Sequence, residues 1–467
     1  MSKRIVFISI FDLTRLFFEI SKGLIEHGHE VFWITTNEIW TRWLIDQGVA
    51  PEDIKQLVYD KSDFINDSDR RQLIEQIVKS ESNASLTINQ SMLMDQFIEQ
   101  KQKPDISEYM LLYYRDIKQF LNDKSATHII AEPTNSNEMI AYMVCRELGI
   151  KFISPRHIRY PSDRLLLFDS YHQEKPLIRN NNGDGIDGRK LIEDFATRKP
   201  APYYFAKHNK TKTLDPRKIV WSIGNRIKRY QTDSGRGLTH HNLSGRIKLS
   251  MRRTINGQYM RWIWHYDDLS KIESKIAFYG LHVQPESSID VLGSYFSDQL
   301  KLIKDIRRAL PFDVTLVVKE HPNFLGIKSI DFFRKLKRIP NVVLVRHDIS
   351  TFEIYKRASI IFTVSGTTGY EGGMLGIPVV MFCPIYFDGL SSVHTCTDLT
   401  LLQELVDKLL NSFERDYEAD CEYMKEMVGN SYPGFWTDPN LYPEVLDPDN
   451  IRKLREAFLE VVNRNAD

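Results

Sequence analysis

Cysteine is scarce in this chain of 467 residues, which has only four. They stand at Cys145, Cys383, Cys396 and Cys421, with no CxxC pair and no spacing typical of a zinc site. This pattern argues against a disulfide framework and against a structural metal centre. We expect free, mostly buried thiols in a reducing compartment.

Net charge and long apolar runs are missing as well. The 62 Lys and Arg residues balance 62 Asp and Glu residues, so total charge selects no partner. The apolar run at residues 5–10 is too short to span a membrane, and no small-residue cleavage site follows it. We expect this run to be the first buried strand of a cytoplasmic protein.

Two ligand-binding signatures are also absent. No GxGxxG motif follows the first predicted strand, which removes the dinucleotide fingerprint. No Asp-x-Asp triplet stands at a convincing strand end, because Asp267 and Asp268 form only a bare pair. We therefore predict no metal site and no bound cofactor.

Hydrophobic strands alternate with helical segments in both halves of the chain. Strands are predicted at residues 4–10, 29–35, 127–131, 151–154, 276–279, 314–319, 342–345, 360–364 and 378–382. Such alternation indicates an α/β fold with parallel sheets. We predict two Rossmann-like domains facing across a cleft, with a basic, mostly helical insert. The predicted divisions are 1–197, 198–270 for the insert, 271–445, and 446–467 for a C-terminal helix.

Two predicted strand ends in the second half carry residues suited to an anion. His321 and Pro322 follow the strand at 314–319, and the sequence Ser-Gly-Thr-Thr-Gly at 365–369 follows the strand at 360–364 and opens a helix. The carboxyl ends of parallel strands meet at one edge of a sheet, and a helix N-terminus favours negative charge. The sequence predicts a site for a phosphate-bearing small molecule; a structural loop histidine and a plain helix cap are the alternatives.

The residues around these motifs resemble a known family. Lys319-Glu320-His321-Pro322, with residues 341–345, 363–371 and 376–380, is similar to the capsule polysaccharide synthesis family, which includes bacterial Kdo transferases. A more distant resemblance is to bacterial sialyltransferases and to polymerases that use CDP-glycerol. The resemblance covers roughly residues 278–382 and implies a glycosyltransferase of the GT-B type, in which the His-Pro loop and the Ser/Thr turn hold the CMP part of an activated sugar.

Donor-binding residues are assigned from the motifs and from this resemblance together. Gln284 is expected to read a base or sugar edge, and Glu286 to pair with a hydroxyl, although a polar interdomain hinge is an alternative for both. The resemblance suggests that Glu371 binds ribose hydroxyls and that His321 also stabilises the leaving group. The full predicted set is Gln284, Glu286, Lys319, His321, Pro322, Ser365, Gly366, Thr367, Thr368, Gly369 and Glu371.

Acceptor-site candidates lie in the first half. Glu132 ends a predicted strand and is a candidate base for an acceptor hydroxyl, but a retaining transferase needs no such base and a capping role is an alternative. Arg156, His157 and Arg159 follow the next predicted strand. They would suit a carboxylate-bearing sugar or a phosphorylated acceptor, or form a solvated surface run.

The predicted insert is strongly basic. Residues 198–261 contain 16 Lys and Arg residues against only Asp215 and Asp233, interleaved with aromatic residues. This composition fits an anionic membrane surface, a lipid-linked acceptor or an acidic glycan, and a solvated helical insert is an alternative. RNA would fit the charge, but no RNA-binding motif is present, so no nucleic-acid partner is predicted.

The sequence therefore predicts a glycosyltransferase of bacterial capsular polysaccharide biosynthesis. The expected donor is a CMP-linked acidic sugar (Kdo or a nonulosonate), and the expected acceptor is a glycan or a lipid-linked molecule. A cytoplasmic location with peripheral contact to the inner face of the membrane through 198–261 is expected. The alternatives are a UDP-sugar-dependent transferase or sugar-nucleotide epimerase of the same fold, and a catalytically silent assembly protein at a membrane complex.

Overall fold

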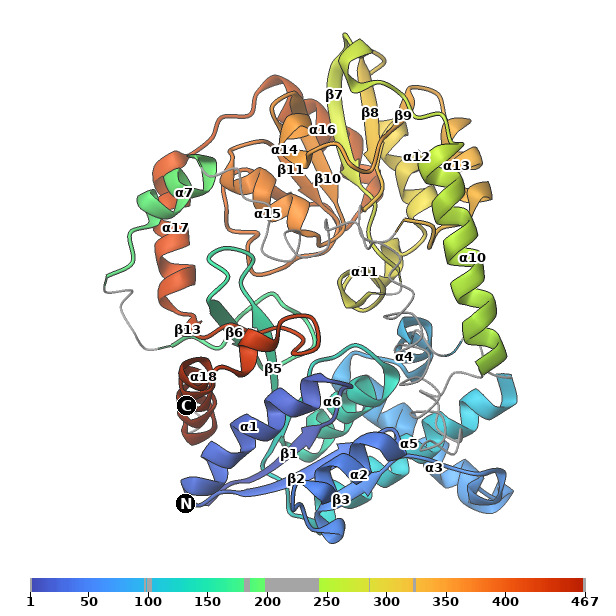
Figure 1. Cartoon of the computed structure of the whole chain (residues 1–467), viewed down its shortest axis with the longest axis vertical. Coiled ribbons are helices and arrows are strands. Elements are labelled where there is room, and N and C mark those ends of the chain that lie inside the picture. The colour runs from blue at the N-terminus through green and yellow to red at the C-terminus, as the bar shows by residue number, and fades with distance from the viewer. Residues whose placement is uncertain are drawn as a thin grey trace, which may run out of the picture.

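Two sheets, each with helices on both faces, organise the chain (Figure 1). The computed structural model describes residues 2–95, 98, 103–179, 185–197, 243–284, 286–321 and 325–464. Residues 198–242, which hold most of the predicted basic insert, and Pro322 lie outside the described residues.

The first sheet has the strand order β13-β6-β5-β4-β1-β2-β3. Strands β3, β2, β1, β4 and β5 run parallel, whereas β6 and β13 are antiparallel to their neighbours. The strands are β1 (Arg4–Ile8), β2 (Glu30–Thr35), β3 (Ile54–Gln56), β4 (His128–Ile130), β5 (Lys151–His157), β6 (Arg164–Phe168) and β13 (Tyr432–Pro433). The central strands are nearly continuous apolar runs, as expected for strands buried on both faces.

Helices cover both faces of this sheet. Side chains from α1 (Leu13–Glu26), α2 (Glu38–Asp46) and α18 (Pro448–Asn463) pack on one face. The other face is covered by α3 (Asp67–Ala84), α4 (Ile88–Met94), α5 (Lys103–Asp123) and α6 (Ser136–Leu148). These four helices lie between β3 and β4 along the chain, apart from α6, which follows β4.

The second sheet has the order β12-β11-β10-β7-β8-β9, and all its strands are parallel. Counted along the chain this is 3-2-1-4-5-6, the order of the dinucleotide-binding Rossmann fold. The strands are β7 (Lys275–Gly280), β8 (Val314–Lys319), β9 (Val342–Val345), β10 (Ala358–Thr363), β11 (Val379–Met381) and β12 (Val393–Thr395). The predicted fold class, two Rossmann-like domains of the GT-B type, is confirmed.

Helices also cover both faces of the second sheet. One face is covered by α10 (Leu243–Trp262), α12 (Gln299–Ala309), α13 (Ile330–Lys337) and α16 (Leu402–Asn411). The other is covered by α7 (Gly188–Thr197), α14 (Thr351–Tyr355), α15 (Thr367–Met374) and α17 (Tyr417–Gly429). The short α11 (Ser287–Asp290) follows β7 and lies between the two domains (Figure 1).

The chain returns to the first domain at its C-terminal end. Although β13 falls inside the range 271–445 predicted for the second domain, it pairs with β6 of the first sheet. Helix α18 then lies along α1, where Arg455 Nε donates to the carbonyl of Glu19 at 2.8 Å (Figure 1). The predicted domain boundaries therefore separate β13 and α18 from the first domain, to which both belong.

A hairpin of the first domain docks on the second. Strand β5 continues to His157, whereas the predicted strand ended at residue 154, because its last residues pair with the unpredicted antiparallel strand β6. Ile158, Leu166 and Phe168 from this hairpin share a buried cluster with side chains of β10, α14 and α15. The two domains are therefore packed together through the β5–β6 hairpin.

The four cysteines are all free and buried, as predicted. Among the described helices, none combines the length and the apolar character needed to cross a bilayer.

Candidate functional site

The candidate site lies at the point where the strand order of the second sheet reverses. Here β7 and β10 are neighbours and their connections leave in opposite directions along the sheet, which is where open α/β sheets bind ligands. His282 follows β7, His321 follows β8, and Ser365 follows β10. The structure thus brings the predicted histidine loop and the predicted Ser/Thr turn to the same edge of three adjacent strands.

The turn after β10 leads into α15, which begins at Thr367. Gly366 is its N-cap and has no side-chain cap hydrogen bond, while its backbone N–H donates to Thr363 Oγ1 at 3.0 Å. Thr367 and Thr368, half-buried, form the first turn of the helix. Gly366 has no side chain that could cap the helix, and the positive end of α15 would favour an anion.

Packing around the turn leaves little room for a side chain at Gly366 or Gly369. A Cβ added at Gly366 would lie 2.8 Å from His282 Cε1, and one added at Gly369 would lie 2.8 Å from Thr363 Cγ2. Gly369 therefore allows α15 to approach β10, rather than a ligand to approach the backbone. Ser365 is fully buried, and its hydroxyl donates to the carbonyl of Ser288 in α11. Thr367 and Thr368 carry the other two hydroxyls of this turn.

His282 is a site residue to which the sequence analysis assigned no role. Its Nε2 accepts the backbone N–H of Val364 at 3.1 Å and lies 3.1 Å from Thr363 Oγ1. Burial lowers the pKa of His282 to about 3, so the ring is neutral and can accept this N–H bond. Its position directly after β7, at the reversal of strand order, was the signal that could have identified it.

A network of amides fixes His282. Gln299 accepts the backbone N–H of His282 at 2.8 Å and donates to the His282 carbonyl at 3.0 Å and to Gln284 Oε1 at 2.6 Å. Gln284 in turn donates to Asp290 Oδ1 at 2.9 Å and to the carbonyl of Ser297 at 3.0 Å. Both ends of the Gln284 amide are therefore occupied within the protein, and its contribution to the site is to hold this loop.

Two predicted donor-site residues lie deeper in the second domain. Glu371 is the fifth residue of α15 and accepts the Tyr355 hydroxyl at 2.6 Å. Burial raises the pKa of Glu371 to about 7, against the opposing charge of Lys319. Lys319 is buried, donates to Thr351 Oγ1 at 2.9 Å, and has a pKa lowered by burial to about 8.

Glu320, beside His321, is also buried in the second domain, and its Oε2 has no hydrogen-bond partner among the described residues. Burial raises the pKa of Glu320 to about 8, against the opposing charge of Lys328. Lys328 reaches the same region and lies 3.3 Å from Gln284 Oε1. The loop that carries His321 therefore lies next to the buried carboxyl group of Glu320 and the amine of Lys328.

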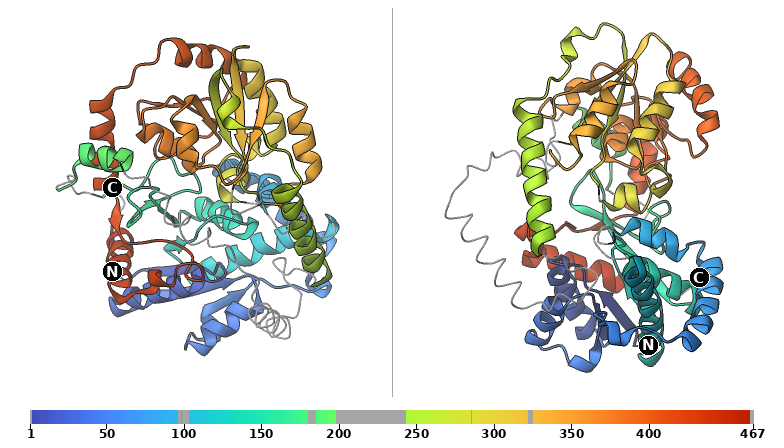
Figure 2. Two further views of the ribbon diagram at one scale, coloured as in Figure 1. Left: turned by 45° about the horizontal axis from the view of Figure 1, so that its top comes forward. Right: turned by 90° about the vertical axis from the view of Figure 1, so that its right-hand side faces the viewer.

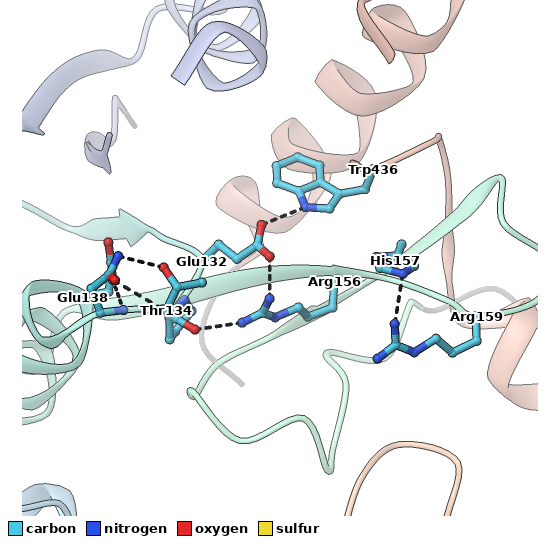
Figure 3. A network of polar contacts seen from close by, with 9 residues as sticks. Glu132, Thr134, Glu138, Arg156, His157, Arg159 and Trp436 are labelled. Atoms are coloured by element: carbon cyan, nitrogen blue, oxygen red, sulfur yellow. Dashed lines mark hydrogen bonds and ion pairs between the residues drawn. The ribbon is translucent and has the colours of Figure 1, made fainter. Parts of the chain in front are cut away.

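Two charged residues predicted for the site in the first domain contact each other (Figure 3). Arg156 and Glu132, predicted for different roles, form an ion pair, and Arg156 also donates to the carbonyl of Pro133 at 3.0 Å. Trp436 Nε1 donates to the second oxygen of Glu132 at 3.2 Å. Burial lowers the pKa of Arg156, which remains a cation paired with Glu132.

The N-terminus of α6, at the corresponding edge of the first sheet, is occupied by carboxylates of the protein. Glu138 Oε2 accepts the backbone N–H groups of Asn135 at 2.6 Å and Thr134 at 3.3 Å (Figure 3), and Asp95 accepts that of Ser136 at 2.9 Å. These contacts satisfy the amide groups that an anionic ligand would need. The amide groups at the start of α6 are therefore bonded to carboxyl groups of the protein itself.

Arg159 connects the two domains. Its guanidinium lies 3.3 Å from His157 Nε2, and burial lowers the pKa of His157 to about 3, so this histidine is neutral (Figure 3). The backbone N–H of Arg159 donates to the Tyr386 hydroxyl at 3.2 Å, and the Tyr370 hydroxyl in α15 donates to the carbonyl of Tyr160 at 2.6 Å. Arg159 is thus held beside α15, away from the Glu132–Arg156 pair with which it was grouped.

The charge of Arg159 acts on the second domain. It lowers the pKa of Glu371 and of the exposed Glu286, against the larger upward effect of desolvation on each carboxyl. The bare acidic pair is structural: Asp267 accepts the N–H of Leu344 at 2.9 Å, and Asp268 caps a short 3₁₀ helix. No group of three His, Cys, Asp or Glu side chains placed to hold a metal occurs within the described part of the chain.

The comparison with protein families agrees with these motifs. Residues 227–425 match the model of a family described as capsule polysaccharide biosynthesis protein. The predicted family resemblance is confirmed. The match includes β7 to β12 and the whole candidate site of the second domain. No curated protein matches the chain significantly.

Several solved structures are similar at low identity. The β-Kdo 2,7 transferase of KpsC from Thermosulfurimonas dismutans is 14% identical, with 75% of this chain and 89% of that chain covered and a TM-score of 0.35. The UDP-GlcNAc 2-epimerase from Methanocaldococcus jannaschii is 13% identical, with 91% and 97% covered and a TM-score of 0.27. These TM-scores are too low for any conclusion about the activity of this chain.

Proposed function

We propose that this protein is a glycosyltransferase of capsular polysaccharide biosynthesis that transfers a sugar from a nucleotide donor to a glycan or lipid-linked acceptor. The observation that carries the proposal is the N-terminus of α15, which lies beside His282 at the reversal of strand order and at the same sheet edge as the His321 loop. The family match over the same residues supports it.

The proposed donor is a CMP-linked acidic sugar such as Kdo or a nonulosonate. CMP carries one phosphate, which suits the first turn of α15 with the hydroxyls of Thr367 and Thr368. The sugar carboxylate needs a cation, and Arg159 is held beside α15 by Tyr386 and by the neighbouring Tyr160–Tyr370 contact. We therefore reassign Arg159 from the acceptor to the donor.

The reaction requires a leaving group to be stabilised. The acceptor hydroxyl oxygen bonds to the anomeric carbon, the bond from that carbon to the phosphate oxygen breaks, and its electron pair leaves with CMP. His321 and the α15 amides would stabilise the phosphate. The hydroxyl proton passes to a carboxylate or to the leaving phosphate. Glu132 stays a candidate base, although both of its oxygens accept hydrogen bonds from Arg156 and Trp436.

The proposal is tested with His321→Ala, and with His265→Ala as an exposed control in the same domain. Transfer from a CMP-linked acidic sugar should fall by at least about a hundredfold in the first variant, as for loss of an oxyanion donor, with thermal unfolding unchanged. The control should keep wild-type turnover. Wild-type-like turnover of His321→Ala would remove His321 from the mechanism.

Calorimetric titration with CMP, UDP and GDP separates this proposal from its rivals. Binding of CMP alone supports the proposed donor, and binding of UDP favours a UDP-sugar transferase or epimerase. Product analysis of a UDP-sugar without acceptor then distinguishes these two, because only an epimerase converts the donor alone. Absence of binding to any nucleotide would favour the assembly protein.

A further inference from the structure

Helix α10 presents apolar side chains to solvent along one face. Met251, Ile255 and Trp262 are 59%, 62% and 77% exposed, and Ile263, directly after the helix, is 58% exposed. Residues separated by four and eleven positions lie on the same side of an α-helix. Met251, Ile255 and Trp262 therefore form a stripe that we call the α10 stripe, and Ile263 follows it in the chain.

The opposite face of α10 fixes the direction of the stripe. Met260 is fully buried in the core of the second domain, and Asn256 Nδ2 donates to the carbonyl of Gly326 at 3.4 Å. Gly257 is so close to Leu325 that an added Cβ would lie 3.2 Å from its carbonyl oxygen. The helix cannot rotate without breaking these contacts, and it runs along the outer edge of the molecule in both views (Figures 1 and 2).

Charge distinguishes α10 from another helix with exposed apolar residues. The 20 residues of α10 include five Lys and Arg and no Asp or Glu, and Arg252 and Arg261 are exposed on either side of the stripe. Helix α3 exposes Ile74 and Val78 by 44% and 55%, but its sequence holds four acidic and three basic residues. Of these two described helices, α10 alone combines an apolar stripe with flanking cations, the pattern of a helix that lies in an anionic bilayer surface.

We infer that α10 docks this protein on an anionic lipid bilayer, with the α10 stripe inserted at the level of the headgroups and Arg252 and Arg261 on lipid phosphates. The charge of segment 198–261 predicted an electrostatic contact with a membrane surface. The α10 stripe adds the insertion of apolar side chains into that surface, and it assigns the contact to one face of α10. The inference rests on the proposed function only in that a membrane-bound enzyme can reach a lipid-linked acceptor.

Vesicle flotation tests the inference. Wild-type protein should float with phosphatidylcholine vesicles that contain phosphatidylglycerol, and binding should weaken without the anionic lipid and at high salt. The variant Met251→Ser/Ile255→Ser/Trp262→Ser should lose at least about tenfold in binding, because three apolar side chains no longer insert. Arg252→Gln/Arg261→Gln should lose the preference for anionic lipid.

The matched control is Ile74→Ser/Val78→Ser in α3, which should bind vesicles as wild type does. Equal vesicle binding by the triple variant, or none by wild type, would overturn the inference. Sedimentation equilibrium tests for self-association. If the wild-type protein were a dimer and the triple variant a monomer, the α10 stripe would be a protein interface and the inference would be wrong. CMP titration of the triple variant should match wild type, so failure of the membrane inference is distinguishable from failure of the proposed donor site.

Discussion

The two domains share a strand order, but the edges at which their ligands would bind are chemically different. In the first domain the N-terminus of α6 is filled by Glu138 and Asp95, and Glu132 is paired with Arg156. In the second domain α15 has no side-chain cap, and the neutral His282 holds the turn before it. The comparison teaches that topology provides two possible anion sites, whereas carboxyl groups of the protein already bond to the amides of the first one.

The same comparison separates residues that bind from residues that support. Arg156 is held by a carboxylate of its own domain, whereas Arg159, three residues later, is held against Tyr386 of the other domain. The predicted cationic cluster is therefore divided: Arg156 belongs to a structural ion pair with Glu132, and Arg159 belongs to the proposed donor site. Variants on each side of this division should affect different quantities.

Among the variants that test this comparison, the largest effect is expected from His282→Ala. Loss of the ring leaves the buried N–H of Val364 without its acceptor and a space beside Gly366, so the turn before α15 loses its support. The free energy of unfolding should fall by about 2–4 kcal/mol, and CMP affinity should fall at least about tenfold. Chemical denaturation and calorimetry measure the two quantities.

The matched control for this variant is His347→Ala, which removes an equally buried histidine that follows β9 in the same sheet. It should lower stability and leave CMP affinity within about twofold of wild type. If both variants lost affinity equally, the effect of His282 would be one of general stability and not of the turn.

Glu132→Ala should have a smaller effect that concerns stability. Removal of the carboxylate leaves Arg156 charged and buried without its ion-pair partner, which costs about 2 kcal/mol, less than for a fully buried pair because Glu132 is partly exposed. The double variant Glu132→Leu/Arg156→Met should cost less than the two single changes added together. Denaturation curves give these values. A hundredfold loss of turnover in Glu132→Gln at unchanged stability would instead establish Glu132 as the base.

The sequence predicted the parts of this comparison that depend on strand patterns. The strands at 314–319 and 342–345 were predicted to the residue, because parallel strands buried on both faces are continuous apolar runs. The predicted position of His321 and the Ser/Thr turn at one sheet edge followed from the same pattern.

Long-range pairing could not be predicted in this way. The β5–β6 hairpin, the pair of Glu132 with Arg156, and the bond from Trp436 across 304 positions to Glu132 depend on contacts that leave no local period in the sequence.

The smallest effect concerns the pH dependence of stability and tests the charge of Glu371 in the second domain. Glu371 has a pKa raised by burial to about 7, with Tyr355, Lys319 and Arg159 favouring its charged form. Because its pKa in the unfolded chain is near 4.5, the folded state holds the proton more tightly, and its contribution is fully present below that value and lost as pH rises towards 7. In Glu371→Gln the side chain cannot ionise, so the decline in unfolding free energy between pH 5 and pH 7 should shrink by on the order of 2 kcal/mol. Urea unfolding of both proteins across this range measures the difference. Parallel curves would mean that Glu371 is already ionised in the folded protein and is held by Lys319 and Arg159 as an anion.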